Sequence, residues 1–166
     1  MLIGLTYDLR SDYLDMGYSA EDTAEFDKEE TVVGIEDALR TLGHTTDRIG
    51  HAKALLQRIA NGDRWDMVFN ICEGLHGVAR EAQVPAILEL YDLPYVFSDP
   101  LVLSLALHKG MTKRIIRDAG VPTSDFVVYE SAQDLLQLSF DPPFFVKPVA
   151  EGTGKGCSAK SVVYDR

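Results

Sequence analysis

Residues 66–97 read DMVFNICEGLHGVAREAQVPAILELYDLPYVF, and this stretch decides the fold class. The apolar, β-prone run at residues 66–71 predicts a strand, and a glycine-bearing loop follows it. Residues 82–93 indicate a helix, in which Pro85 is tolerable only near the first turn. Residues 95–97 predict another short strand. Strand, loop, helix and strand in this order are the repeating unit of a parallel sheet.

The same alternation is found nearer the amino terminus. Residues 2–7 and 47–49 predict further strands, and residues 32–42 and 54–59 have apolar positions at helical spacing. We therefore expect an α/β, Rossmann-like domain whose parallel sheet is covered by helices on both faces. Ligands of such sheets bind at the carboxyl ends of the strands, so the loops after the first strand and after residue 71 are the places to look for a site.

The pattern changes near residue 105, where two short helices and three strands follow one another without a closing helix. These elements are expected at residues 109–119, after Ser131, and at residues 126–129, 144–147 and 158–164. We therefore predict a first domain at residues 1–105 and an incomplete α+β domain at residues 106–166.

Composition limits the classes of function. Hydrophobic residues make up 46% of the 166 residues and charged residues 25%, which is typical of globular proteins. The formal net charge of −10 argues against nucleic-acid binding, which needs a basic surface. Neither Cys72 nor Cys157 has a CxxC partner, so no zinc site is expected. No signal peptide and no run of about 18 apolar residues is present, so we expect a cytoplasmic chain without a membrane partner.

A glycine-rich stretch at residues 144–158, FFVKPVAEGTGKGCS, is the first candidate for chemistry. Lys147 ends the expected strand, and the turn contains Gly152, Gly154 and Gly156. Glycine lets backbone amides approach phosphate oxygens, and a lysine at a strand end can pair with phosphate. The simpler interpretation is a mobile β-hairpin with an exposed lysine.

This turn differs from two better-known phosphate loops. A Walker A loop would need Gly at 149 and Ser or Thr at 156, where the chain has Val149 and Gly156. The glycines also do not open a helix, as they do in a Rossmann GxGxxG turn. A glycine-rich strand–turn–strand covers a nucleotide from above instead.

Four segments together resemble the ATP-grasp superfamily and, within it, the D-alanine–D-alanine ligases. Those enzymes read like LHG…LLELLGIPYVGS…ALAMDKALTKRLLRAAGLPTP…FVKP…GSSVG. This chain reads LHG at residues 75–77, then ILELYDLPYVFSDP, LSLALHKGMTKRIIRDAGVPTSDFVVY and FFVKPVAEGTGKG. Order and spacing match from about Ala86 to Ser158. By itself, a lysine such as Lys109 is usually part of a solvated helix face.

The resemblance implies a pre-ATP-grasp domain followed by part of the ATP-grasp central subdomain. It implies a reaction in which a carboxylate takes the γ-phosphate of ATP, becomes an acyl phosphate and is then attacked by an amine, with Mg²⁺ as a further cofactor. It also implies small amino-acid substrates, a place in peptidoglycan synthesis for the cell wall, and a homodimer formed through the amino-terminal domain.

The resemblance assigns roles to individual residues. Lys109 and Lys147 match the two lysines that contact the phosphates of ATP. His76 matches a histidine beside the first amino-acid site, although a loop histidine is more often structural. The loop that closes over nucleotide and substrate is matched by Glu151, Gly152, Thr153, Gly154 and Gly156, with Thr153 also positioning the substrate.

An early glutamate of these enzymes holds the substrate ammonium. The matching acidic stretch offers Glu25, Asp27 and Glu30 as candidates, and the resemblance does not choose among them. Their simpler interpretation is the start of a helix, where acidic side chains favour the helix dipole.

Two departures leave the substrate open. Residues 78–82 read VAREA where the ligases have a GEDG-type turn, and Lys155 stands where they carry an apolar residue. The metal-binding carboxylates, Asn and Arg of the family lie in a carboxyl-terminal region that nothing here matches. We therefore expect this chain alone to bind ATP weakly or not at all, to hold no Mg²⁺ and to catalyse no ligation.

Three alternatives remain. The chain can be a standalone α/β binding or regulatory module derived from a ligase. It can belong to an ATP-grasp ligase for other amino acids or peptides. A flavodoxin-like nucleotide-binding enzyme is the third, and the absence of a phosphate loop after the first strand argues against it.

Overall fold

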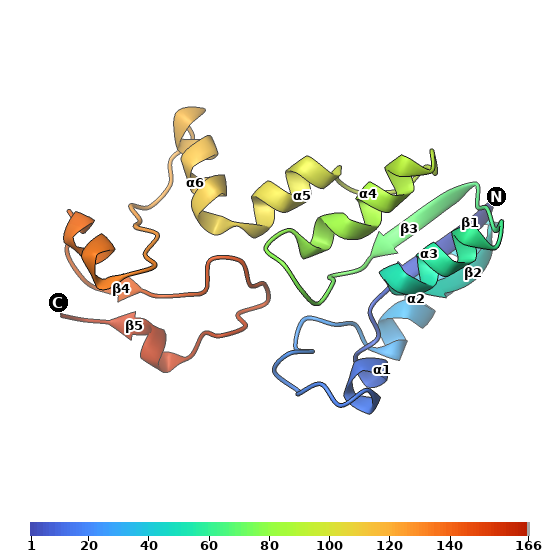
Figure 1. Ribbon diagram of the computed structural model, residues 1–166, viewed down its shortest axis with the longest axis horizontal. Helices are drawn as coiled ribbons and strands as arrows, with labels where there is room; N and C mark the ends of the chain where they lie inside the picture. The colour runs from blue at the N-terminus through green and yellow to red at the C-terminus, as the bar shows by residue number, and fades with distance from the viewer. Residues whose placement is uncertain (166) are drawn as a thin grey trace. The chain divides into compact units, whose positions relative to one another are not determined.

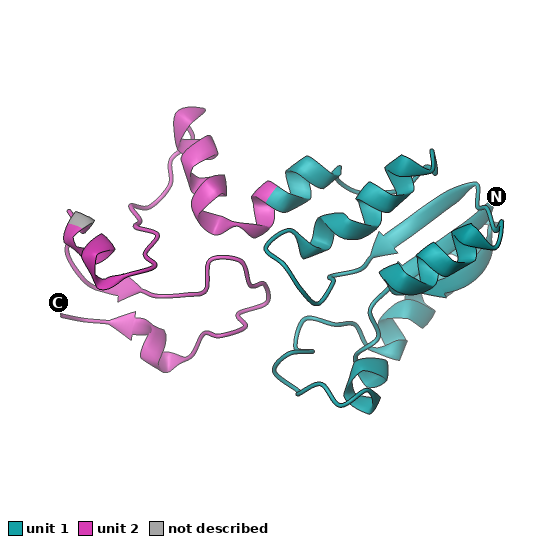
Figure 2. Ribbon diagram, viewed as in Figure 1, with its two compact units in different colours: residues 1–104 teal, residues 105–166 magenta. Residues whose placement is uncertain are grey.

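The computed structural model describes residues 1–165, which separate into two compact units, Met1–Ser104 and Leu105–Arg166 (Figure 2). The first unit contains a parallel sheet of β1 (Leu2–Tyr7), β2 (Thr45–Gly50) and β3 (Met67–Ile71) in the order β2-β1-β3 (Figure 1). The predicted α/β class with a parallel sheet is thereby confirmed.

The central strand, β1, is buried on both faces, which explains its nearly unbroken apolar sequence. Its Tyr7 lies opposite Ile71 of β3, so both strands end at the same edge of the sheet. The strand expected at residues 95–97 is reduced to a single bridge between Val68 and Tyr95. The reason is Phe97, whose φ of 78° takes the backbone out of the extended region.

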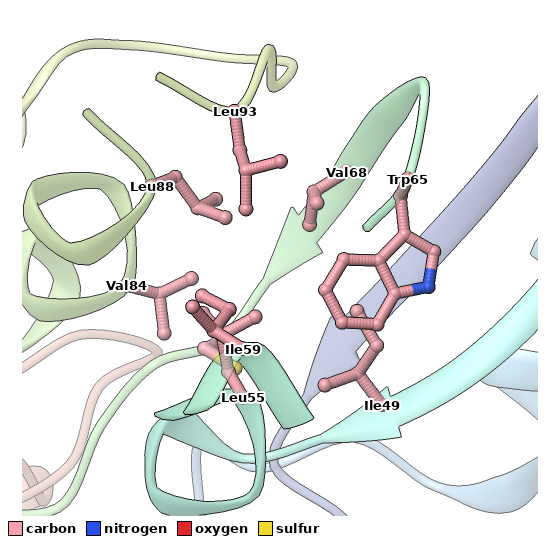
Figure 3. Close-up of a cluster of buried hydrophobic side chains, with 9 residues drawn as sticks. Ile49, Leu55, Ile59, Trp65, Val68, Val84, Leu88 and Leu93 are labelled. Carbon is pink, nitrogen blue, oxygen red and sulfur yellow. The ribbon is translucent and has the colours of Figure 1, made fainter. Parts of the chain in front are cut away.

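Helices cover both faces of the sheet. On one face, Val32 of α2 (Glu29–Thr41) lies beside Leu5 and Phe69. On the other face, α3 (Ala52–Ala60) and α4 (Gln83–Leu90) cover the main apolar cluster (Figure 3). Its buried members are Ile49, Leu55, Ile59, Trp65, Val68, Cys72, Val84, Leu88 and Leu93. Burying each large apolar side chain contributes about 1.5–3 kcal/mol, so this cluster is the main source of stability in the unit.

Two regions of this unit contain more helical elements in the structure than the sequence predicted. The long loop expected at residues 11–28 begins with a short helix, α1 (Arg10–Asp15), whose Tyr13 ring packs 4.5 Å from that of Phe26. The helix expected at residues 82–93 is a 3₁₀ turn, η1 (Arg80–Ala82), followed by α4. Pro85 lies in the first turn of α4, where no intrahelical N–H bond is lost. Helix α5 (Pro100–Leu107) follows along the chain.

The second unit contains α6 (Lys109–Asp118), η2 (Ala132–Gln137), β4 (Phe144–Phe145), η3 (Ala159–Ser161) and β5 (Val162–Val163). Strands β4 and β5 are antiparallel, with Phe144 opposite Val163. The helix expected after Ser131 is the 3₁₀ helix η2, whose capping box joins Ser131 and Asp134.

All three strand predictions for this unit are wrong or too long, and β4 covers only Phe144–Phe145 of the strand expected at residues 144–147. The described residues 126–129 form no strand, because the Phe126 ring packs instead against the charged ends of Lys113 and Arg117 from α6. The strand expected at residues 158–164 is limited to β5, because Ser158 caps the 3₁₀ turn η3. Within residues 1–165, no helix has both the length and the apolar character needed to cross a bilayer.

Candidate functional site

The loops that follow β1 and β3 are tied together by Asp8. Its side chain is 2% exposed, and its Oδ2 accepts hydrogen bonds from the backbone N–H groups of Glu73 (3.0 Å) and Gly74 (2.8 Å). The Tyr13 hydroxyl donates to Oδ1 at 2.5 Å. Burial, together with this hydrogen bond, raises the pKa of the Tyr13 phenol. Asp8 thus fixes the edge of the sheet at which a ligand site is expected.

A cavity of about 390 Å³ lies at this edge of the first unit. Its volume falls in the range of small-molecule sites. Polar and apolar side chains share its lining, which consists of Asp27, Asn70, Ile71, Cys72, Glu73, Glu81, Phe97 and Leu103. The sequence directed attention to these loops, and the structure places a cavity there.

The cavity is acidic, and its carboxyl groups perturb one another. Burial raises the pKa of Glu73 to about 7, and the neighbouring charges of Glu81 and Glu25 add to the increase. Burial also raises the pKa of Asp27, against a hydrogen bond with Thr31 that lowers it. A ligand cation bound beside Glu73 and Asp27 would stabilise their charged forms and so lower both pKa values.

The first unit also contains a buried ion pair. The Arg80 Nη2 atom is 2.7 Å from Glu25 Oε2, and the two side chains are 5% and 3% exposed. Such a pair persists in a low-dielectric site because each charge compensates the other. It joins the acidic loop before α2 to the loop that leads into η1, two segments 55 residues apart.

The three acidic candidates for holding an amine have different environments. Asp27 lines the cavity, Glu25 is paired with Arg80, and Glu30 is exposed in the first turn of α2. His76 is exposed, and its backbone carbonyl accepts a hydrogen bond from the Gln83 side chain at 3.0 Å. His76 is not among the residues that line the cavity.

Phe97 forms part of the apolar wall in an unfavourable backbone conformation. Its φ of 78° is rare for a bulky residue, and its ring meets that of Phe69 edge to face at 5.3 Å. The ligase pattern has Gly at this position. A non-glycine residue held in such a conformation is a reason to examine the neighbouring site for function.

In the second unit, the glycine-rich turn is attached to the start of α6 through Lys109. The Lys109 backbone N–H donates to the Val149 carbonyl at 2.9 Å, and its Nζ donates to the Glu151 carbonyl. The Glu151 carboxylate lies 3.3 Å from Lys155 Nζ. Lys147 is exposed, with its Nζ 5.9 Å from the centre of the Phe145 ring. The structure thus brings Lys109 to the glycine-rich turn. Lys147 lies in the same stretch of sequence, just before that turn.

The turn itself has the backbone that its glycines predict. Residues Thr153, Gly154 and Gly156 have φ values of 45°, 78° and 73°. At Gly156, an added Cβ would lie 2.6 Å from Pro148 Cγ, so only glycine fits there. Gly152 accepts a hydrogen bond from the Lys155 N–H at 2.9 Å. This geometry leaves a tight turn whose left-handed backbone lets amide groups approach an anionic ligand.

Sequence reasoning did not single out Asp8, Asn70 or Arg80. Asp8 directly follows the strand predicted at residues 2–7, and Asn70 is the penultimate residue of the strand predicted at residues 66–71. Polar residues at the carboxyl ends of parallel strands often line a ligand site, so these two could have been identified from the sequence. Arg80 was visible only as a departure from the GEDG-type turn. Its partner, Glu25, lies too far away in the sequence for the pairing to be read. Among residues 1–165, no group of three or more His, Cys, Asp or Glu side chains is placed to hold a metal ion.

Comparison with known proteins gives a consistent set of relatives. No protein-family model matches the chain. The D-alanine–D-alanine ligase of Parvibaculum lavamentivorans is 33% identical over 123 residues, covering 74% of this chain and 39% of that relative. A crystal structure of the D-alanine–D-alanine ligase of Bacillus anthracis matches with a TM-score of 0.66 and 22% identity, covering 100% of this chain and 50% of that one. The same ligase complexed with ATP gives a TM-score of 0.59 at 21% identity, covering 100% and 51%. The chain spans 38–41% of the length of the curated ligases of this kind that it matches over 123 residues.

Proposed function

Because this chain belongs to the D-alanine–D-alanine ligase-like proteins and matches their amino-terminal part, we propose that it is the amino-terminal part of an ATP-dependent carboxylate–amine ligase. The observation that carries the proposal is the 33% identity over 123 residues. We assign residues 1–105 to a pre-ATP-grasp domain and residues 106–166 to part of an ATP-grasp central subdomain. A cytoplasmic location accompanies this assignment, since the reaction draws on cytoplasmic ATP.

The second unit has side chains that fit the phosphates of ATP. Lys109, Lys147 and Lys155 lie on or beside the glycine-rich turn, whose left-handed backbone allows its amides to approach an anion. When bound, ATP supplies the phosphoryl group that activates a carboxylate for attack by an amine. In this assignment, Lys109 and Lys147 neutralise phosphate charge, and the turn with Thr153 covers the reacting groups and excludes water.

We propose that this chain does not by itself complete a magnesium site. Mg²⁺ is usually held by one or two carboxylates together with substrate phosphates, and residues 1–165 contain no group of three or more His, Cys, Asp or Glu side chains placed to hold a metal ion. We therefore derive no magnesium-dependent step from this chain, and we propose that ligation needs residues beyond those present here. The lengths of the relatives support that need, since the chain spans only about two fifths of them.

The cavity of the first unit is our candidate for the amino-acid substrate. Its carboxylates can hold an ammonium group, and Asp27 is the early acidic residue that lines it. Glu25 already neutralises Arg80, and Glu30 is exposed, so neither is as well placed as Asp27. His76 lies in the loop between β3 and η1, and we assign it to the rim of the same site only through the resemblance.

A segment exchange tests the proposed function. The matching segment of the Parvibaculum lavamentivorans ligase is replaced with that of this chain, and ATP-dependent formation of D-alanyl-D-alanine is followed by mass spectrometry. We expect product, and we expect Lys109→Met or Lys147→Met to reduce kcat by about 10²–10³-fold, as loss of a charge-stabilising group does. Lys160→Met, which removes an exposed lysine, is the matched control.

The exchange has clear negative outcomes. A folded chimera that releases no phosphate, or lysine variants as active as the Lys160→Met control, would contradict the proposal. The 166-residue chain is assayed in parallel with ATP, Mg²⁺ and D-alanine, and we expect neither phosphate release nor amide formation. Product from that chain alone would show that no further residues are needed.

A further inference from the structure

Glu151 contacts two lysines of the second unit through two different groups. Its backbone carbonyl accepts a hydrogen bond from Lys109 Nζ, and its Oε2 atom lies 3.3 Å from Lys155 Nζ. Lys109 is the first residue of α6, whereas Lys155 is on the glycine-rich turn. A single residue therefore holds two ammonium groups from separate segments close to one another.

The backbone of the turn determines where the side chain of Lys155 begins. The Lys155 N–H donates to the Gly152 carbonyl at 2.9 Å. The two residues between them, Thr153 and Gly154, both have positive φ, as in a type I′ turn. The Cys157 N–H then donates to the Gly154 carbonyl, also at 2.9 Å. Lys155 is thus part of two successive turns, and Glu151 faces it from the other side of the first.

The charge of Lys155 is a departure from the ligase pattern. The ligases carry an apolar residue at this position, so the resemblance assigns Lys155 no role. An apolar side chain can pair neither with a carboxylate nor with a phosphate, whereas a lysine ammonium has three N–H donors. An ammonium group at the turn is therefore a property of this chain and not of the family pattern.

The carboxylate of Glu151 opposes an anion at the same place. A phosphate on Lys109 would lie beside Glu151, because the Lys109 ammonium already contacts that residue, and like charges repel. A terminal phosphate carries a charge of about −1.5 to −2 and three strong acceptor oxygens. It is therefore a stronger partner for an ammonium group than a single carboxylate is.

We propose that Glu151 competes with the phosphates of the nucleotide for Lys155. A bound phosphate takes over the Lys155 ammonium, and the Glu151 carboxylate is released from it. Lys155 is then a further phosphate-binding lysine, in addition to Lys109 and Lys147, and Glu151 limits how tightly the turn holds an anion. The inference rests on the proposed function, in which the turn covers the phosphates. It changes the role of Glu151, whose carboxylate weakens nucleotide binding instead of supporting it.

Binding of inorganic tripolyphosphate to the 166-residue chain, followed by calorimetric titration at low salt, tests this inference. Glu151→Gln should tighten binding about threefold, because a partly exposed ion pair contributes little and that contribution is what phosphate must overcome. Lys155→Gln should weaken binding about tenfold, the loss typical of a hydrogen bond between charged groups, and Lys155→Arg should retain most of the affinity. The double variant Glu151→Gln/Lys155→Gln should bind no more tightly than Lys155→Gln, because the gain requires the released ammonium.

The second unit offers matched controls. Glu130→Gln and Lys160→Gln remove the same charges from exposed positions and should change the affinity much less. They separate an exchange at the turn from the general attraction of an anion to a less negative chain, which salt screens. A misfolded variant cannot imitate the expected result for Glu151→Gln, because that result is a gain in affinity.

The outcomes also separate this inference from the proposed function. If Glu151→Gln binds tripolyphosphate no more tightly than the unmodified chain does, the competition is refuted, and the pair with Lys155 serves to hold the shape of the turn. Absence of binding to both the unmodified chain and Glu151→Gln would overturn the inference as well. The ligase proposal is decided separately, by whether the exchanged segment forms product.

Discussion

Removal of Arg80 is the sharpest test of how the candidate site is held together. Arg80 and Glu25 are almost fully buried, with 2.7 Å between Nη2 and Oε2. At the effective dielectric constant of about 20 that suits protein interiors, two unit charges about 4 Å apart attract by about 4 kcal/mol. Breaking a buried pair by removing one partner costs about 3–5 kcal/mol, because the other charge is left uncompensated. Arg80→Met should therefore lower the free energy of unfolding by about that amount.

The assay uses the only tryptophan of the chain. Trp65 is 5% exposed in the core of the first unit, so its fluorescence reports unfolding of that unit in urea. With a urea dependence of roughly 2 kcal/mol per molar, the expected loss moves the midpoint down by about 1.5–2.5 M. Asp37→Asn is the control, because its pair with Arg40 spans 3.9 Å on the surface and contributes less than about 1 kcal/mol.

The double variant Glu25→Leu/Arg80→Met completes the cycle. If the cost of the single variant comes from an uncompensated charge, removing both charges should restore most of the stability, and the two single losses should not add. A midpoint shift below about 0.5 M for Arg80→Met, or a double variant as unstable as the two losses summed, would refute the reasoning.

Two further predictions concern the acidic cavity and the glycine-rich turn. Glu73→Gln should stabilise the first unit by about 1–2 kcal/mol at pH 8 and change little at pH 4, measured by urea unfolding at both pH values. The native pKa of about 7 lies above the ordinary 4.5, so the acid's contribution is present below pH 4.5 and is lost as pH rises through 7, with the magnitude reduced for solvent screening. Gly156→Ala should destabilise the second unit by about 1–3 kcal/mol more than Gly154→Ala in thermal melts. Both have positive φ, but only at Gly156 does a Cβ meet Pro148, at 2.6 Å. Equal losses at the two glycines would contradict the close approach.

Several elements of both units could be predicted because their signals are local. The run at residues 66–71 differs from β3 by one residue, and the helix expected at residues 109–119 differs from α6 by one. Both rest on apolar spacing and on end signals such as Gly120. The apolar periodicity was sufficient to predict an element wherever that element has an apolar face of its own to bury.

The failures all involve partners that periodicity cannot identify. Residues 126–129 have the composition of a strand, yet Phe126 contacts the cations of α6 and the described segment has no pairing partner. Residues 95–97 fail as a strand because Phe97 adopts a conformation that the sequence does not signal. Strand propensity is a weak guide when pairing and burial are decided by distant residues.

For the candidate site, too, the position could be predicted from the sequence, but the pairing of its side chains could not. The loops after β1 and β3 were expected to carry it, and Asp27, which lies between β1 and α2, was one of three acidic candidates for holding an amine. The choice among them depends on Arg80, because an arginine buried against Glu25 removes that carboxylate from the set available to a ligand. Asp27, Glu73 and Glu81 line the cavity, and burial raises the pKa of Glu73, with the charges of Glu81 and Glu25 adding to the increase. A cation bound there would reverse that shift, so occupation of the cavity by an amine and ionisation of Glu73 must favour each other. Arg80 therefore favours Asp27 over Glu25 as the acid that can meet an amine, while the burial of Glu73 sets the pH range in which the site is most attractive to that amine.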